Sequence, residues 1–147
     1  MSLNRVQITV YSSQRDLKLS VFSIRKMVKA LLNYWGVFPD EVVVGFVSKQ
    51  KITTLHGRFF NDPTPTDCLA FPVDSSLLGE VVLCPRVAKE YADARGKDPY
   101  QEISLYLIHA LLHLLGYTDR PKKERERMRR KEKMSLNYLQ EKGLLLS

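Results

Sequence analysis

The stretch His109-Ala110-Leu111-Leu112-His113-Leu114-Leu115-Gly116-Tyr117-Thr118-Asp119 contains two of the three histidines in this chain of 147 residues. Its apolar residues predict a helix, and a spacing of four places His109 and His113 on one face, one turn apart. Gly116 suits the left-handed residue just past a helix end, and Asp119 follows in the next turn. Two imidazoles and one carboxylate suit zinc, so the stretch predicts an open site for one Zn²⁺ per chain.

The helix that carries these histidines has a clear start. Asp98 is a natural N-cap, and Pro99 suits the first helical position. From there to Gly116 the sequence is apolar around nearly the whole circumference, which predicts a central, buried helix. Burying an imidazole without a partner costs about 1–3 kcal/mol, and a shared metal removes that cost for both rings. Two core histidines with ordinary hydrogen-bond partners are the alternative.

The remaining elements predict an α+β fold. The expected strands are Gln7–Tyr11, Val42–Val47, Cys68–Phe71 and Glu80–Cys84, with a turn at Asp74–Gly79. The expected helices are Val21–Trp35, Lys49–Leu55, Pro85–Arg95, the histidine helix and a charged helix after Arg120. We predict one domain over residues 1–147, a single four-stranded mixed sheet packed with about five helices, and a metal site at the C-terminal end of the central helix.

The composition is that of an ordinary globular protein, with 44% hydrophobic and 27% charged residues. No apolar run approaches the roughly 20 residues of a membrane span, and the first residues do not resemble a secretory signal. The two cysteines, Cys68 and Cys84, predict buried thiols and a reducing compartment rather than a disulfide framework. We therefore expect a cytoplasmic protein with no membrane partner, and the oligomeric state stays open.

The net charge of +7 is concentrated in one segment. Residues 120–133 contain nine Lys or Arg and three Glu. Such a basic block attracts polyanions and speeds their capture. A solvated helix with internal Glu/Lys pairs is the alternative reading.

The histidine helix lacks one feature of zinc peptidases. In the His-Glu-x-x-His pattern a glutamate beside the first histidine acts as the general base. This chain has Ala110 at that position, which cannot accept a proton. Peptidase chemistry by that route is therefore disfavoured.

Three stretches resemble the YbeY family of rRNA maturation factors, which are zinc-dependent endoribonucleases. Residues 65–72, Pro-Thr-Asp-Cys-Leu-Ala-Phe-Pro, resemble the family's Pro-Thr-Asp-Val-Leu-Ser-Phe-Pro. Residues 78–84 resemble Leu-Gly-Asp-Ile-x-Ile-Cys, and residues 109–119 resemble His-Gly-x-Leu-His-Leu-x-Gly-Tyr-Asp-His. Met128, in the charged helix, and Gly143 also fit the family.

The resemblance implies a cytoplasmic, single-strand-specific endoribonuclease that matures the 3′ end of 16S rRNA and takes part in ribosome quality control. Its partners would be single-stranded RNA, rRNA and the ribosome. Its metal ligands would be His109, His113 and Asp119, and its catalytic residues Arg58 and His113. RNA capture would use the basic 120–133 segment through phosphate contacts.

This chain departs from the family pattern at three positions. The third zinc histidine is replaced by Asp119, which is still a legitimate zinc ligand. The arginine thought to hold the scissile phosphate is replaced by Phe60, so Arg58, two residues away, and Arg86 are the candidate substitutes. The serine of the Pro-Thr-Asp motif is replaced by Ala70.

Two alternatives stay open. His56 could be the third ligand, with Asp119 hydrogen-bonding to another ligand and orienting it without touching the metal. The chain could also be a ribosome-associated assembly factor with a structural metal and little or no nuclease activity, which the residues Phe60 and Ala70 favour.

Overall fold

The computed structural model describes residues 6–73 and 77–147. Within them one four-stranded sheet has the order β1-β2-β4-β3. The strands are β1 (Gln7–Ser13), β2 (Glu41–Val47), β3 (Cys68–Pro72) and β4 (Leu77–Leu83). Strands β1, β2 and β4 are parallel, and β3 is antiparallel to β4. The helices are α1 (Val21–Trp35), α2 (Lys49–Phe60), α3 (Pro85–Arg95), α4 (Pro99–Leu114) and α5 (Lys122–Lys142). The predicted α+β fold with a mixed sheet is confirmed.

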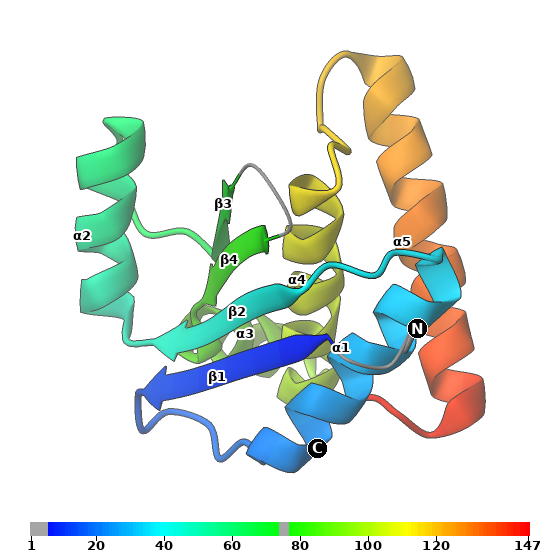
Figure 1. Ribbon diagram of the computed structural model, residues 1–147. Coiled ribbons are helices and arrows are strands. Elements are labelled where there is room, and N and C mark those ends of the chain that lie inside the picture. The colour runs from blue at the N-terminus through cyan, green and yellow to red at the C-terminus, as the bar shows by residue number, and fades with distance from the viewer. Residues whose placement is uncertain (1–5, 74–76) are drawn as a thin grey trace.

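Helices cover both faces of the sheet, as Figure 1 shows, with α2 on one side and α1, α4 and α5 on the other. The larger core lies on the α4 side and contains Val42, Val44 and Phe46 of β2. A smaller cluster on the α2 side contains Val47 and Ile52. Strand β2 therefore has apolar neighbours on both faces, which accounts for its continuous apolar sequence.

Helix α4 lies at the centre of the larger core, as its sequence predicts. The Asp98 carboxylate accepts the backbone N–H of Tyr100 at 2.9 Å and caps the start of the helix. Nine of its residues are buried: Ile103, Ser104, Tyr106, Leu107, Ile108, Ala110, Leu111, Leu112 and Leu114. Gly116 has a φ of 98°, a conformation that residues with a Cβ rarely adopt, and it turns the chain back toward the helix.

Three predicted boundaries are wrong. Strand β1 continues to Ser13, two residues beyond the predicted Tyr11, because its pairing with β2 extends that far. Helix α2 does not end near Leu55 but continues to Phe60, because Gly57 is accommodated within the helix and Asn61, with a φ of 54°, forms the left-handed cap. Residues 74–76 of the predicted turn lie outside the described residues. Its last part, 77–79, belongs to β4, because this segment pairs with Glu41 of β2 and with Pro72 of β3.

Of the two cysteines predicted to be buried, Cys84 is buried and Cys68 is half-buried. Cys68 and Cys84 are both free, and burial raises the pKa of each thiol. Among the described residues, no helix has the length and apolar character needed to cross a membrane.

Candidate metal centre

Three predicted ligands meet at the C-terminal end of α4. The Nε2 atoms of His109 and His113 are 3.0 Å apart. Asp119 Oδ2 lies 3.2 Å from His113 Nε2 and 3.5 Å from His109 Nε2. The helical spacing of four aligns the two rings, and the turn at Gly116 returns the carboxylate to them. Among the described residues these three form the group able to hold a metal ion.

The geometry of this group fits a small divalent cation. Tetrahedral ligands bonded at about 2.0–2.1 Å, as zinc prefers, lie about 3.3 Å from one another. The three separations here, 3.0, 3.2 and 3.5 Å, are close to that edge length. Asp119 Oδ1 is buried and has no hydrogen-bond partner within the described part of the chain. A buried carboxylate oxygen without a partner is costly, and a bound cation would compensate for it.

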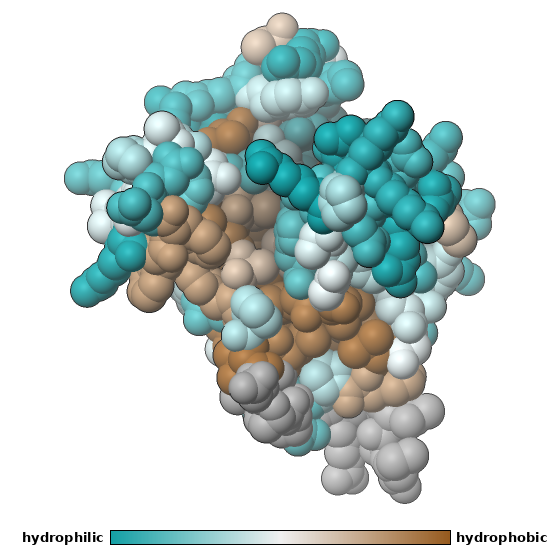
Figure 2. Space-filling view, turned by 90° about the horizontal axis from the view of Figure 1, so that it is seen from above, coloured by the Kyte–Doolittle hydropathy of each residue, from teal (hydrophilic) through white to brown (hydrophobic). Residues whose placement is uncertain are grey.

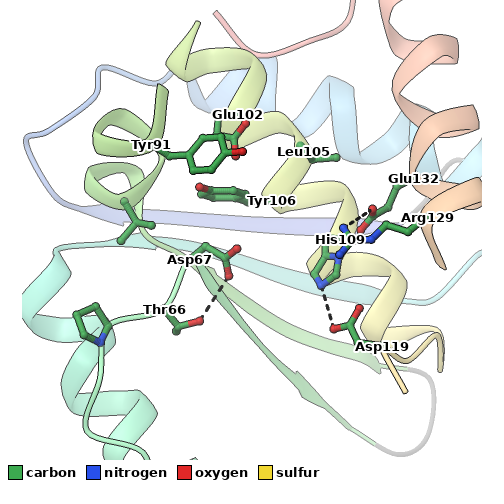
Figure 3. Close-up of a pocket in the computed structure, with 12 residues that line it drawn as sticks. Thr66, Asp67, Tyr91, Glu102, Leu105, Tyr106, His109, Asp119, Arg129 and Glu132 are labelled. Carbon is green, nitrogen blue, oxygen red and sulfur yellow. Dashed lines mark hydrogen bonds and ion pairs between the residues drawn. The ribbon is translucent and has the colours of Figure 1, made fainter. Parts of the chain in front are cut away.

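Glu132 of α5 orients the His109 ring through Nδ1, the ring nitrogen that does not face the other two ligands. Its carboxylate is buried, with 5% of the residue exposed, and accepts a hydrogen bond from His109 Nδ1–H. With the proton fixed on Nδ1, the lone pair of Nε2 faces Asp119, as Figure 3 shows, and also His113. Burial lowers the pKa of His109, but the hydrogen bond and charge of Glu132, together with the charges of Asp119 and Asp67, raise it overall. The same negative field favours a metal cation.

Glu132 is absent from the site predicted from the sequence, because a segment this rich in charge is expected to be exposed to solvent. A pattern in the sequence could have identified it. Four residues of α5 share its inner face at helical spacing: Met128, Glu132, Ser135 and Leu139. A glutamate among otherwise apolar or small residues on a buried face indicates a specific partner, since buried charges need one.

A cavity of about 650 Å³ opens beside His109, between α3, α4 and α5 (Figure 3). Its lining includes four carboxylates, those of Asp67, Glu102, Asp119 and Glu132. Arg129 is the one arginine or lysine among the described residues that line it, and its Nη1 lies 3.4 Å from Glu132 Oε1. The cavity is therefore acidic apart from one guanidinium group.

A second cavity, of about 360 Å³, lies on the other side of the metal ligands. His113 lines it together with His56, Phe60 and Ala70. Thr66 lines both cavities. The candidate metal centre is thus flanked by an acidic cavity and by a smaller one of mixed polarity, which contains two of the positions departing from the family pattern.

Neither predicted phosphate-binding arginine lines these two cavities. Arg58 is exposed in the last turn of α2, with its guanidinium carbon 5.9 Å from the centre of the Phe59 ring. Arg86 is occupied by ion pairs with Asp16 at 3.0 Å and Glu90 at 3.4 Å. The catalytic role of Arg58 stays a prediction.

His56 lies outside the group of three ligands. Its Nδ1–H donates to the carbonyl oxygen of Thr64 at 2.7 Å, and its Nε2 is 3.8 Å from Asp62 Oδ2. The geometry therefore supports Asp119 rather than His56 as the third ligand.

Replacing each candidate third ligand separately tests this choice. We expect Asp119→Ala to weaken zinc binding more than about 100-fold. Replacing a residue that only hydrogen-bonds to a ligand already lowers metal affinity about 10- to 100-fold, and loss of a ligand itself should cost more. His56→Ala is the matched control and should keep its zinc. The measurement is a zinc competition titration. Wild-type affinity in Asp119→Ala, with loss in His56→Ala, would reverse the assignment.

Known proteins are similar to this chain over most of its length. The family model described as Endoribonuclease YbeY matches residues 8–140. The Endoribonuclease YbeY of Chlamydia caviae is 37% identical, over 97% of this chain and 96% of that protein. The Endoribonuclease YbeY of Protochlamydia amoebophila is 43% identical, over 78% of this chain and 80% of that protein.

A solved structure has the same fold. The solution structure of a Thermotoga maritima protein superposes with a TM-score of 0.64 and 25% identity, covering 88% of this chain and 87% of that one. The residues that the family model matches include nearly all of the sheet, the whole of α4 and the three candidate metal ligands. The chain therefore belongs to the YbeY family of endoribonucleases.

Proposed function

We propose that this endoribonuclease cleaves single-stranded RNA with the help of one zinc ion held by His109, His113 and Asp119. Its proposed substrate is ribosomal RNA, at the 3′ end of 16S rRNA, with a role in ribosome quality control in the cytoplasm. We further propose that residues 1–147 act as a single domain. The observation that carries the proposal is the convergence of three ligand atoms within 4.8 Å of one another.

We infer the roles of the residues from their positions. When bound, the zinc ion would supply Lewis-acid chemistry to a phosphodiester and to the water that attacks it. His113 would act in catalysis as a ligand that also lines the smaller cavity, and Glu132 would keep His109 in the tautomer that presents Nε2. The basic residues at the start of α5 would attract the RNA backbone.

The surface supports a single-stranded substrate. Figure 2 shows a hollow between a strongly hydrophilic wall and an apolar one, on the end of the molecule where α2 ends and α5 begins. A recessed site at a helix end is hard for a rigid A-form duplex to reach, whereas an unpaired strand can bend into it.

We infer that Arg129 binds a substrate phosphate. A phosphate that approaches the acidic cavity needs a cation, and the Arg129 side chain is 64% exposed with one ion pair to Glu132. We expect Arg129→Ala to lower kcat/KM by about 10-fold or more, since hydrogen bonds to charged groups contribute about 1.5–3 kcal/mol. The measurement is steady-state cleavage of a short RNA at fixed salt.

Two other variants serve as comparisons for Arg129→Ala. Arg130→Ala removes an exposed arginine from the same helix outside the cavity lining, and it should have little effect. Arg58→Ala tests the residue that the sequence predicts. Equal losses in Arg129→Ala and Arg130→Ala would show that α5 acts only through its net charge.

The experiment that tests the proposed function uses a short RNA bearing the 3′ end of 16S rRNA. We expect cleavage by the zinc-loaded protein, loss of cleavage with a chelator, and recovery when zinc is restored. A duplex of the same sequence should be cleaved poorly. Cleavage that persists in the chelator would contradict zinc dependence.

An assembly factor with a structural metal is the second candidate. The observation in its favour is that Phe60 and Ala70 line the cavity beside His113, where the family pattern has an arginine and a serine. This candidate would be supported if the chelator unfolds the protein while the zinc-loaded protein never cleaves RNA.

A further inference from the structure

Exposed aromatic rings gather at the C-terminal end of α2. Phe59 is 58% exposed and Phe60 is 49% exposed. Both rings pack on Phe71 of β3, with ring centres at 5.3 Å for Phe59 and 5.8 Å for Phe60. The His56 ring lies 5.9 Å from that of Phe60. A folding core would bury such rings, so their exposure as a group indicates a binding surface.

The segment after α2 holds these rings in a defined place. The backbone N–H of Thr64 and its hydroxyl both donate to Asp62 Oδ1, at 3.0 and 2.6 Å. The carbonyl of Thr64 in turn accepts the hydrogen bond from His56. Pro63 and Pro65 restrict the backbone on either side. The aromatic surface is thus supported by a well-connected turn, and little ordering is needed when a ligand binds.

The aromatic surface adjoins the metal centre. Phe60 and His56 line the same cavity as His113, and Thr66 connects that cavity to the acidic one that contains Arg129. A strand of RNA that places a phosphate at the metal would therefore carry a neighbouring base toward Phe60. The Arg58 guanidinium beside Phe59 adds positive charge near the backbone of that strand.

We propose that Phe60, with His56 and Phe59 beside it, forms a stacking subsite for one unpaired nucleobase of the RNA substrate. The proposal rests on the proposed function, because it names how the same centre holds its substrate. Aromatic rings bind the flat face of any base, so this subsite would select unpaired bases over duplex without reading sequence. Phe60 would then contribute substrate binding at the position where the family pattern has an arginine.

An abasic scan of the substrate tests this subsite. A short single-stranded RNA is prepared with the base removed at each position in turn, and kcat/KM is measured for each. With the wild-type protein, one position near the cleaved bond should cost about 10-fold. Phe60→Ala should lose about 10-fold on the intact RNA and show no further loss at that abasic position. Phe60→Trp should restore both the rate and the abasic penalty.

Phe22→Ala is the matched control. Phe22 is a more exposed phenylalanine, at 71%, and it lies on α1, away from the aromatic surface. This variant should cleave like the wild type and keep the abasic penalty. A 2-aminopurine base at the sensitive position gives a readout of stacking itself, since its fluorescence should be quenched by the wild type and not by Phe60→Ala.

The outcomes separate this proposal from the one on which it rests. If the wild type cleaves RNA and Phe60→Ala cleaves equally well, or keeps the full abasic penalty, the subsite is refuted while the nuclease stands. The exposed aromatic rings would then be assigned to the binding of a protein partner. If the wild type cleaves no RNA and quenches no 2-aminopurine at any position, the proposed function fails together with the subsite.

Discussion

Replacing His113 by alanine is expected to remove bound zinc and RNA cleavage together. His113 Nε2 lies 3.0 Å from His109 Nε2 and 3.2 Å from Asp119 Oδ2, so its loss leaves a site with two protein ligands. Two ligands do not hold zinc at the affinity of three, and we expect a drop of more than about 100-fold. The measurements are zinc per chain after dialysis and the cleavage rate at a fixed zinc concentration.

The fold should survive this change, because the His113 side chain is 31% exposed and lies at the end of α4. The melting temperature measured with chelator should therefore match that of the wild type. Gln101→Ala, an exposed substitution in the first turn of the same helix, is the control and should keep both zinc and activity. Undiminished cleavage by His113→Ala would refute the metal-dependent mechanism.

Replacing Glu132 by alanine is expected to have the next largest effect, although Glu132 is not a ligand. Without its carboxylate, His109 Nδ1–H loses its partner and the ring is free to change tautomer and orientation. Removing such a supporting carboxylate costs about 10- to 100-fold in metal affinity. Glu132→Gln keeps an oxygen that can accept the hydrogen bond, so its loss should be smaller.

Glu126→Gln gives the matched control for this pair, since Glu126 is an exposed glutamate on the same helix. It changes the net charge of the protein by the same amount without touching His109. Zinc affinity is measured by competition with a chromophoric chelator for each variant. Equal affinities of the wild type and Glu132→Ala would show that the His109 ring needs no support from α5.

The elements that the sequence predicts well are those set by local chemistry. Ser20 caps α1 and Gly36 ends it, as its residue type favours. The helix from Pro85 to Arg95 has the predicted bounds, because proline starts it and Gly96 supplies the left-handed end. The pairing of His109 with His113 is likewise local, since a helix fixes the direction of residues four apart.

The features that the sequence analysis missed depend on packing between distant segments. Glu132 meets His109 across 23 positions of the chain, and only the docking of α5 against α4 brings them together. The length of α2 beyond Gly57 likewise depends on context. A glycine weakens a helix by about 1 kcal/mol, and the packing of Phe59 and Phe60 on Phe71 offsets that loss.

The proposed site thus has three parts with separate tasks. The candidate metal ligands lie at the C-terminal end of α4 and in the turn after it. The acidic cavity with Arg129 lies on one side of them, and the second cavity, which Phe60 lines, lies on the other. Each task has its own variant, so zinc binding, phosphate binding and base stacking can be measured independently.

The most direct test of the metal centre is a crystal structure of the zinc-loaded protein with data collected on both sides of the zinc absorption edge. We expect one anomalous peak, which marks a zinc ion bonded to His109 Nε2, His113 Nε2 and Asp119 Oδ2 at about 2.0–2.2 Å from each. A peak held by other residues, or zinc-loaded crystals in which the two rings bond only each other and the Asp119 carboxylate, would contradict the proposed centre.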